Sequence, residues 1–218
     1  MIERIVPGWV SVAESRHDHG PDDLFPAERA VIANALAKRR AEFSTVRRCA
    51  RAALAELGIA AAPILPGERG APQWPSGVVG SMTHCAGFRA AAVAADRLAV
   101  SIGLDAEPHE VLPDGVCGIV ARPEERSQLV ELSARRPELH WDRLLFTMKE
   151  SVYKTWYPLT GRWLDFMQAS VFIDAERDRF VARLLVPGPV VRGVEVTSFA
   201  GRFTVEDGLA ISAIVLAA

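Results

Sequence analysis

Hydrophobic and polar residues alternate at two periods along the chain, and the period predicts where helices and strands form. Between residues 27 and 57, apolar side chains recur at spacings of three and four, which predicts a helix that Gly58 ends. Residues 139–157 follow the same period, and Pro158 is expected to end that helix. A charged segment at residues 124–136 predicts a shorter helix on the surface.

Short apolar runs bounded by turn residues predict strands in much of the remaining chain. These runs cover residues 87–95, 98–105, 169–173, 180–186, 190–199 and 209–216. Residues 63–80 contain four prolines and predict a loop, and residues 1–26 predict an irregular arm. Residues 88–102 weakly resemble residues 203–214, each a strand, a tight turn and a strand. The similarity indicates two related halves, although hairpins are common enough for chance to explain it.

The composition is that of a folded globular protein and excludes several classes. Of 218 residues, 50% are hydrophobic and 24% are charged, and 25 basic against 27 acidic residues leave a formal charge of −2. A general nucleic-acid binder would carry excess positive charge, and no apolar run approaches the ~20 residues that span a bilayer. Cys49, Cys85 and Cys117 are odd in number and widely spaced, as is typical of reduced thiols. We expect a cytoplasmic protein without nucleic-acid or membrane partners.

Two acids stand at the end of a predicted strand. Asp105 and Glu107 are separated by one residue, so both carboxylates project from the same face of an extended chain. Hard oxygen ligands of this kind suit Mg²⁺, which proteins hold with one or two carboxylates beside a phosphate. The alternative is a pair of solvated turn residues in front of Pro108.

The helix predicted at residues 139–157 carries a second charged group, formed by Lys149, Glu150 and Lys154. Glu150 and Lys154 are four residues apart and therefore lie on the same side of the helix. One interpretation is an exposed ion pair worth about 0.3–0.5 kcal/mol. The other places Glu150 on a cation or a substrate proton and Lys154 on a phosphate.

A polar segment from Gly80 to Cys85 follows the Pro- and Gly-rich loop. It is not a GxSxG nucleophile elbow. One interpretation is nevertheless that Ser81 or Cys85, near His84, acts as a nucleophile. Alternatively, the segment donates hydrogen bonds to an anion. Basic residues at positions 38–40, 47, 48, 51 and 69 precede it, and they form either a solvated face or a site for a phosphate-rich ligand.

Three blocks in this order resemble the 4′-phosphopantetheinyl transferases of the surfactin- and enterobactin-synthetase type. The blocks are Gly80–Gly87, Ser101–Glu107 and Phe146–Lys154. The resemblance is closest to the actinobacterial branch, which modifies carrier proteins of lipid, polyketide and siderophore synthesis. It implies an α+β fold with pseudo-two-fold symmetry, in which two similar halves, residues 1–106 and 107–218, enclose the active site. It also implies transfer of 4′-phosphopantetheine from coenzyme A to a serine of an apo acyl or peptidyl carrier protein, with release of adenosine 3′,5′-bisphosphate.

The resemblance further implies roles for individual residues. Asp105, Glu107 and Glu150 would bind one Mg²⁺, with Mn²⁺ as an alternative, and Glu150 would be metal ligand, general base or both. Lys154 would stabilise the pyrophosphate, and Lys149 would have a weaker supporting role. The residues expected to contact the phosphates of coenzyme A are Arg39, Arg47, Arg69, Ser81, Thr83 and His84. Of these, Arg47 and His84 are expected at the adenine 3′-phosphate.

The sequence departs conservatively from the family at Phe146, commonly Trp, at Ser151, commonly Ala, and at Leu104, commonly Ile. We expect a monomer, since pseudo-symmetry within one chain can replace a dimer interface. The basic, partly apolar segment at residues 112–136 is expected to dock the acidic carrier, because a charge of −2 offers no global attraction. Two rival functions are a Mg²⁺-dependent phosphohydrolase, with water as acceptor, and a noncatalytic nucleotide-binding module.

Overall fold

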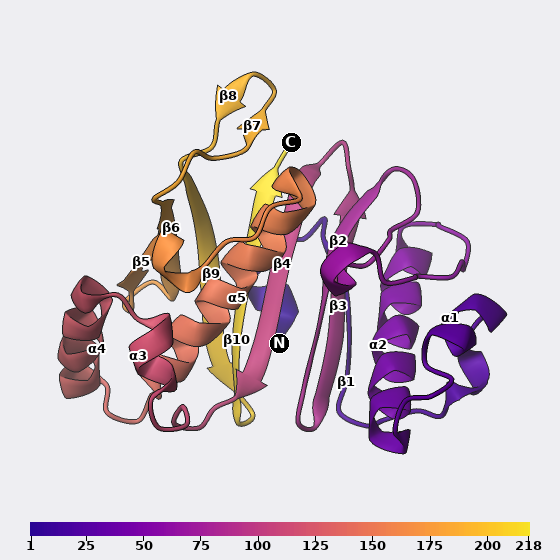
Figure 1. The fold of residues 1–218 in the computed structure, drawn as a ribbon, viewed down its shortest axis with the longest axis horizontal. Coiled ribbons are helices and arrows are strands. Elements are labelled where there is room, and N and C mark those ends of the chain that lie inside the picture. Colours follow the sequence, from indigo (N-terminus) through magenta and orange to yellow (C-terminus); the bar gives the residue numbers. More distant parts are fainter.

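Two antiparallel sheets stand side by side, and each carries a long helix on one face, as Figure 1 shows. The computed structural model describes residues 1–218, apart from the side chain of Asp22. The helices are α1 (Pro26–Val31), α2 (Ala37–Glu56), α3 (Val116–Val120), α4 (Pro123–Arg135) and α5 (Trp141–Thr160). The strands are β1 (Ser11–Ser15), β2 (Val78–Cys85), β3 (Phe88–Ala95), β4 (Ala99–Pro108), β5 (Ala169–Asp174), β6 (Arg179–Leu184), β7 (Val190–Val191), β8 (Val194–Glu195), β9 (Ser198–Glu206) and β10 (Leu209–Ala217). Short 3₁₀ helices lie at η1 (Ile2–Arg4), η2 (Pro21–Asp23), η3 (Glu68–Gly70) and η4 (Phe166–Gln168).

The N-terminal half consists of the sheet β1-β3-β2 and of α2, which packs on β1 and β3. The middle strand, β3, is buried on both faces, which explains its run of small residues from Ala90 to Ala94. Small side chains let the helix come close, and Ala50, Ala53 and Leu54 of α2 form a core with this strand. The helix is thereby held against the sheet whose outer strand, β2, faces the other half.

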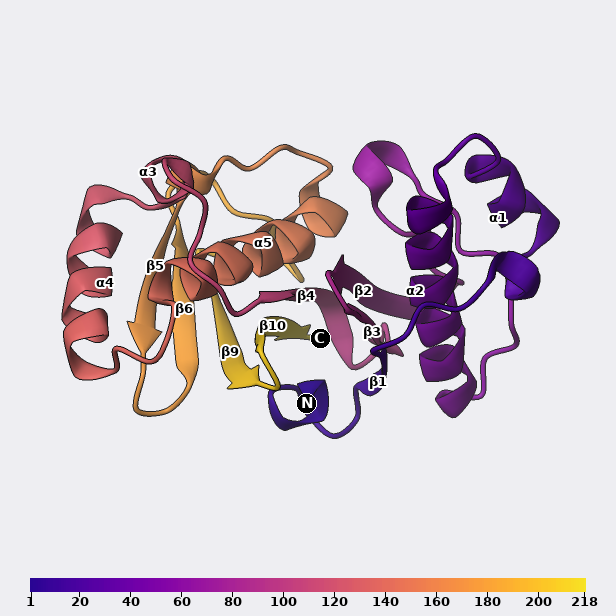
Figure 2. The same ribbon diagram turned by 90° about the horizontal axis from the view of Figure 1, so that it is seen from below.

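The C-terminal half consists of the sheet β4-β10-β9-β6-β5 with α5 along one face, as Figure 2 shows from below. The core-facing side chains of α5 recur at spacings of three and four, namely Trp141, Leu144, Leu145, Met148, Val152 and Trp156. The predicted helices at residues 124–136 and 139–157 are confirmed as α4 and α5. The strands predicted at residues 169–173, 180–186 and 209–216 are confirmed as β5, β6 and β10.

The two halves share part of their core. Ile2 and Ile5 pack with residues of β3, β4 and β10, so the beginning of the chain lies across the junction. β4 pairs with β10 along its length, and the division expected between residues 106 and 107 runs through this strand. The fold is therefore α+β with two similar halves, as the sequence predicted. No helix among the described residues combines the length and hydropathy needed to cross a bilayer.

The N-terminal region differs from its prediction in two places. The expected irregular arm contains β1, which pairs with β3 in antiparallel register. The helix predicted over residues 27–57 is broken into α1 and α2, because the chain turns at residues 32–36. This turn buries Ile32 against Leu24 and Phe43, a contact that the local period of apolar residues does not reveal.

The predicted internal repeat is only partly correct. β3 and β4 form as expected, but they belong to different sheets and do not pair, whereas β9 and β10 form a hydrogen-bonded hairpin. The similarity between residues 88–102 and 203–214 is therefore only a similarity in the pattern of strands. The prediction of a duplicated hairpin is wrong.

Two further boundaries near the C-terminus were predicted wrongly. Residues 190–199 are not one strand, because β7 and β8 form their own short ladder and β9 begins only at Ser198. Pro158 lies inside the last turn of α5, where a proline removes only one helical hydrogen bond. The helix ends instead at Gly161, whose N–H donates to the carbonyl oxygen of Tyr157 at 2.8 Å.

Candidate active site

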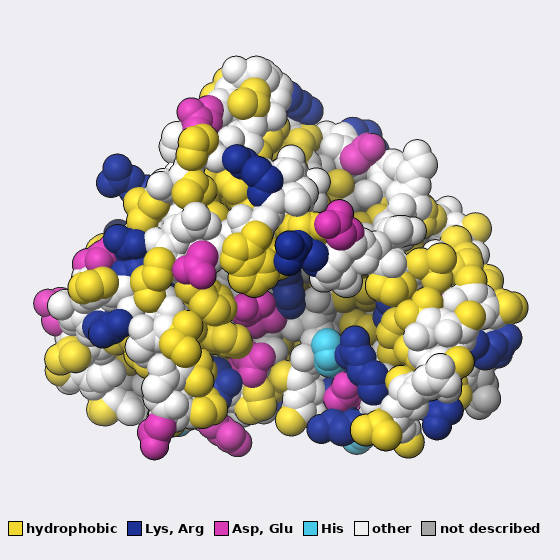
Figure 3. Space-filling view, in the orientation of Figure 1, with side chains coloured by type: hydrophobic (Ala, Val, Ile, Leu, Met, Phe, Trp, Pro, Cys, Tyr) yellow, Lys and Arg dark blue, Asp and Glu magenta, His cyan; other side chains and the backbone are white. Residues whose placement is uncertain are grey.

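A cleft of about 690 Å³ lies where the two halves meet. Its walls come from the loop around Arg69, from β2 at Ser81, and from α5 at Glu150, Tyr153 and Lys154. Figure 3 shows a hollow between the two halves, with acidic side chains on one side and a histidine with Lys or Arg side chains on the other. Charges of opposite sign facing one another across a cleft suit an anionic ligand that carries a cation.

A close contact between α5 and β4 brings the charged side of the helix to the strand. A Cβ atom at Gly103 would lie 2.0 Å from the carbonyl oxygen of Ser151 and 2.3 Å from Oγ1 of Thr155. Hydroxyl groups satisfy buried carbonyl oxygens around this contact, since Ser101 Oγ donates to Thr155 O at 2.8 Å and Ser151 Oγ donates to Ser212 O at 3.0 Å. The contact therefore requires glycine on the strand.

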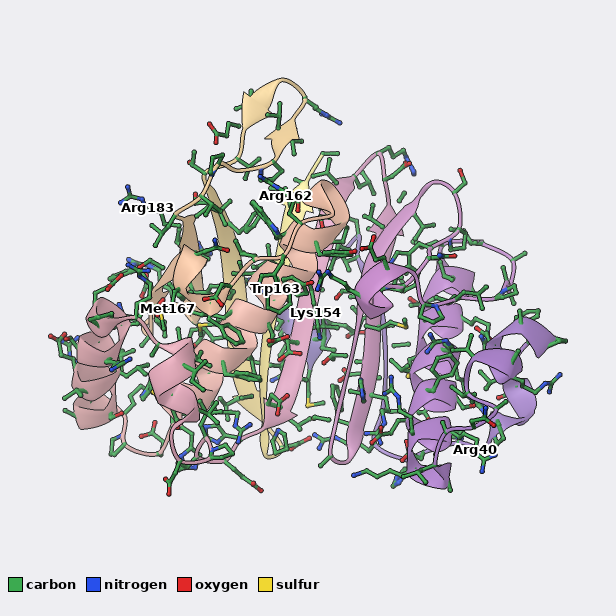
Figure 4. All side chains as sticks on the ribbon, in the orientation of Figure 1. Arg40, Lys154, Arg162, Trp163, Met167 and Arg183 are labelled. Carbon is green, nitrogen blue, oxygen red and sulfur yellow. The ribbon has the colours of Figure 1, made fainter. Side chains whose placement is uncertain are left out.

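Asp105 and Lys154 form the centre of the site. Lys154 Nζ lies 2.7 Å from Asp105 Oδ1 and 3.0 Å from the carbonyl oxygen of Leu104, and Figure 4 shows its side chain reaching from α5 toward β2. Asp105 is only 5% exposed, which excludes a solvated turn residue. Burial raises the pKa of its carboxyl against the attraction of Lys154. Lys154 pairs with Asp105, so the exposed pair with Glu150 is also excluded.

Glu107 and Glu150 extend the acidic wall on either side of Asp105. Arg143, in the first turn of α5, donates from Nη1 to Glu107 Oε2 at 3.2 Å. Its Nε and Nη2 donate to the carbonyl oxygens of Glu110 and Val111, which follow Glu107 in the chain. Burial raises the pKa of both glutamates, and the negative charge of Asp105 raises the pKa of both further. The three carboxylates therefore repel one another electrostatically.

The chemistry of the three acids fits a divalent cation, although they do not form a finished cage. Asp105 Oδ2 is buried and has no hydrogen-bond partner among the described atoms. A cation such as Mg²⁺ prefers carboxylate oxygens and would relieve the repulsion that raises the pKa of Glu107 and Glu150. Within the described part of the chain, no three His, Cys, Asp or Glu side chains already surround a metal position. Lys154 and Arg143 neutralise two of the acids instead.

His84 of β2 and Arg39 of α2 contact each other in the N-terminal half. Arg39 Nη1 lies 2.8 Å from His84 Nε2, and Glu42 lies 4.0 Å from the same nitrogen. Burial, followed by the positive charge of Arg39, lowers the pKa of His84 to about 4, so at neutral pH the ring is neutral and accepts from Arg39. The charge of Lys154 also acts on the pKa of His84, so the structure brings these predicted site residues together.

Arg69 joins the same cleft from η3. Its guanidinium lies 5.5 Å from the ring centroid of Trp163, which belongs to the other half. Arg69 also adopts φ = 53°, a backbone conformation that is uncommon for residues other than glycine. The side chain is thus held where the halves face each other, and its contact with a phosphate stays a prediction.

The predicted phosphate contact Arg47 and the predicted supporting residue Lys149 are instead buried within their own halves. Arg47 is 5% exposed, and its Nε donates to the carbonyl oxygen of Ile64 at 2.8 Å. Lys149 is 3% exposed, and its Nζ lies 2.7 Å from Glu125 Oε2 and 2.7 Å from the carbonyl oxygen of Phe166. In this arrangement both cations bind groups of the folded core, so neither is offered to a ligand.

The segment from Gly80 to Cys85 forms β2 and contains no activated nucleophile. Ser81 Oγ accepts the N–H of Leu104 at 3.1 Å, while His84 Nε2 is bound to Arg39. Burial and the charges of Glu107 and Asp105 raise the pKa of Cys85 to about 12, so its thiol stays protonated. Thr83 is 1% exposed, and its hydroxyl faces Asp105.

A smaller pocket of about 180 Å³ adjoins the cleft and escaped the sequence analysis. Tyr153 and Glu150 line both cavities, and the ring of Trp163 lies 5.1 Å from that of Tyr153. Tyr153 follows Glu150 by about one helical turn and so lies on the same side of α5. This spacing could have predicted Tyr153 as a residue of the site. Arg143 precedes Glu150 by two turns, so the same helical spacing could have predicted it. Trp163 follows the helix in a loop, where no periodic pattern predicts its position.

Comparison with known proteins identifies the family. A family model described as the 4′-phosphopantetheinyl transferase N-terminal domain matches residues 27–94, and one described as the 4′-phosphopantetheinyl transferase superfamily matches residues 101–196. The chain is 55% identical to 4′-phosphopantetheinyl transferase Svp of Streptomyces mobaraensis over 222 aligned residues, which cover 100% of this chain and 90% of Svp. This chain belongs to the 4′-phosphopantetheinyl transferase superfamily.

Two more relatives agree with this assignment. 4′-phosphopantetheinyl transferase PptT of Mycobacterium tuberculosis is 48% identical over 88% of this chain and 85% of its own. 4′-phosphopantetheinyl transferase Npt of Nocardia iowensis is 48% identical over 100% of both chains. The resemblance to the actinobacterial branch is confirmed, and the chain is a transferase enzyme rather than a noncatalytic module.

The departures from the usual pattern of 4′-phosphopantetheinyl transferases have local explanations. Ser151 places its hydroxyl 2.7 Å from that of Ser212, so each buried hydroxyl has a partner. Leu104 packs in the core that the two halves share. Phe146 packs beside Phe166, with ring centroids 6.0 Å apart. None of the three changes removes a charged group from the cleft.

Proposed function

We propose that this chain transfers 4′-phosphopantetheine from coenzyme A to a serine hydroxyl of an apo acyl or peptidyl carrier protein, with Mg²⁺ as its cation and adenosine 3′,5′-bisphosphate as second product. The observation that carries the proposal is a group of three interacting carboxylates with Lys154, whose charge also acts on the pKa of His84. Transfer from a pyrophosphate needs this neutralisation and alignment of charge more than covalent help. The names of the relatives, all 4′-phosphopantetheinyl transferases, support the same reaction.

Two adjoining cavities match the two ends of coenzyme A. We place the charged nucleotide in the larger cleft, near Arg69, whose guanidinium can pair with phosphate oxygens. The uncharged pantetheine arm then lies in the smaller pocket, among Leu164, Phe166 and neighbouring apolar groups. Because Glu150 lines both cavities, the pyrophosphate between the two ends lies beside it.

The residues of the cleft divide the work of the reaction. The serine oxygen attacks the phosphorus that carries pantetheine, and the bond from this phosphorus to the adenosine-side phosphate oxygen breaks. Glu150, which lines both cavities, accepts the serine proton directly or through a water. Lys154 places a compact positive charge at the oxygens that become negative. Bound Mg²⁺, held by Asp105, Glu107 and Glu150, would neutralise the pyrophosphate.

The carrier protein is expected to dock beside α3. In this segment Ile119 is 67% exposed, and α3 packs against both α5 and η4, whose Phe166 lines the smaller pocket. Arg126, a basic residue of the segment 112–136 that was predicted to dock the carrier, donates to the carbonyl oxygens of Ala121 and Gly118 and so holds α3 to α4. Replacing Ile119 by Glu therefore tests docking with less damage to the fold than reversing Arg126. We expect a higher KM for the carrier and an unchanged KM for coenzyme A.

Intact-mass spectrometry of an apo carrier tests the reaction itself. The enzyme, coenzyme A and Mg²⁺ should add one phosphopantetheine to the carrier, and adenosine 3′,5′-bisphosphate should accumulate in equal amount. Release of this nucleotide without labelling of the carrier would support the rival phosphohydrolase, in which water replaces serine.

Two glutamate variants make the test specific. Glu150→Gln keeps the shape of the side chain but removes the base and the charge, and it should abolish most of the transfer. Glu176→Gln is the matched control, because Glu176 lies exposed in the turn between β5 and β6 and should keep the full rate. Equal rates for the two variants would contradict the role of Glu150.

A further inference from the structure

β2 and β4 are the facing edge strands of the two sheets, and they meet through side chains instead of a backbone ladder. Ser81 Oγ accepts the N–H of Leu104 at 3.1 Å, and Thr83 Oγ1 accepts the N–H of Ala106 at 3.1 Å. From the first contact to the second, the residue number rises by two in both strands, so β2 and β4 run parallel here. The two hydroxyls thereby satisfy amide groups that a paired strand would otherwise satisfy.

Thr83 differs from Ser81 because it also touches Asp105. Its Oγ1 donates to Asp105 Oδ1 at 3.2 Å while it accepts from Ala106. A hydroxyl has one proton to donate, and here that proton is used. Thr83 is also only 1% exposed, so its hydroxyl is not available to the phosphate that the sequence analysis assigned to it.

The contacts of Asp105 are concentrated on one of its two oxygens. Lys154 Nζ at 2.7 Å and Thr83 Oγ1 at 3.2 Å both bind Oδ1. Oδ2 is buried and has no hydrogen-bond partner among the described atoms. Two donors on the same oxygen prevent the carboxylate from turning, and so they keep the other oxygen in a fixed place.

We infer that Thr83 is a positioning residue whose hydroxyl holds Asp105 by Oδ1 and thereby keeps Oδ2 free for a divalent cation. The inference rests on the proposed function, in which Asp105 is a ligand of that cation. Hydrogen-bond partners of ligating groups commonly change metal affinity or activity by about 10- to 100-fold when they are removed. Thr83 would act in this way without touching either the cation or coenzyme A.

Binding of Mn²⁺ to the complex with coenzyme A tests the inference, with free Mn²⁺ counted by electron paramagnetic resonance. Mn²⁺ takes the same oxygen ligands as Mg²⁺. Thr83→Val keeps the shape of the side chain without the hydroxyl, and it should lower the affinity for Mn²⁺ by about 10- to 100-fold. Thr83→Ser should restore the affinity. Thr204→Val is the matched control, because it makes the same change in β9 at a residue that lines neither cavity, and it should keep the affinity of the wild type.

The kinetic readout separates positioning from a purely structural role. Thr83→Val should lower kcat and raise the Mg²⁺ concentration needed for half the maximal rate, while the KM for coenzyme A stays unchanged. A circular-dichroism melt checks that the variant is folded. If it is not, Thr83→Cys takes its place, and this weaker donor and acceptor should give an intermediate affinity for Mn²⁺.

Three results would overturn the inference while the proposed function stands. They are wild-type affinity for Mn²⁺ in Thr83→Val, or in Thr83→Cys if that variant replaces it, an equal loss of affinity in Thr204→Val, and no recovery in Thr83→Ser. Failure of the wild type to bind Mn²⁺ in the presence of coenzyme A would instead overturn the metal site of the proposed function, and the inference with it.

Discussion

Gly103→Ala adds one methyl group at the closest contact between α5 and β4. The new carbon would lie 2.0 Å from the carbonyl oxygen of Ser151, whereas ordinary contacts begin at 3.4 Å. The helix must therefore withdraw by about the difference, roughly 1.4 Å, since the backbone of β4 is held by its ladder with β10. Glu150 and Lys154 would move with the helix, away from Asp105.

Two quantities should change together. Inserting a carbon into a close-packed contact costs about 1–3 kcal/mol, which lowers the melting temperature by roughly 2–12 °C in a chain of this size. A displacement of about 1 Å in a catalytic group can cost on the order of 100-fold in rate. We therefore expect a folded enzyme with a transfer rate reduced by up to about 100-fold, measured by intact mass of the carrier and by a thermal melt.

Gly8→Ala is the matched control. A Cβ atom at Gly8 meets no heavy atom within 4 Å, so this variant should stay within about 0.5 kcal/mol of the wild type and keep its rate. A lower melting temperature for Gly103→Ala with an unchanged rate would show that the close contact stabilises the fold without positioning the helix. Wild-type values for both quantities would refute the packing argument altogether.

Two further predictions follow from the buried and perturbed groups. Lys149→Met leaves Glu125 charged and buried without its cationic partner, so the free energy of unfolding in urea should fall by about 3–5 kcal/mol. Unchanged stability together with a higher KM for coenzyme A would instead indicate that Lys149 contacts coenzyme A. The pKa of His84 is about 4 in the free protein, and a bound phosphate should raise it, so adenosine 3′,5′-bisphosphate should bind with proton uptake and more tightly as the pH falls below neutral. Calorimetry in buffers of different ionisation enthalpy measures this uptake, which His84→Gln should remove; its absence in the wild type would contradict a phosphate contact at His84.

Local sequence patterns were enough to predict the elements whose apolar residues recur at a regular period within a single segment. The period of apolar residues predicted α5 because Trp141, Met148 and Trp156 all face one core. β1 was missed because its pairing with β3 is a contact between segments that are far apart in the sequence. Similarly, the break between α1 and α2 depends on the burial of Ile32 against Leu24, which no local period reveals.

The same division runs through the active site. The spacing of Asp105 and Glu107 and the order of the three sequence blocks were sufficient to predict a site for cations and phosphates, because carboxylates two residues apart on a strand share a face. The partners of each charge were not predictable. Lys154 pairs with Asp105 and Lys149 pairs with Glu125, and both partners come from other elements.

The resemblance of three sequence blocks to a known family predicted the fold class and the family, and the local spacing of Asp105 and Glu107 predicted that their carboxylates share one face. Only the tertiary structure decided which polar groups face the cleft and which serve the core. Arg47 and Lys149 look as available as Arg39 in the sequence, yet burial commits them to carbonyl oxygens and to carboxylates of their own half. The reason is physical: a buried donor must be satisfied by its nearest acceptor, and packing between distant segments chooses that acceptor.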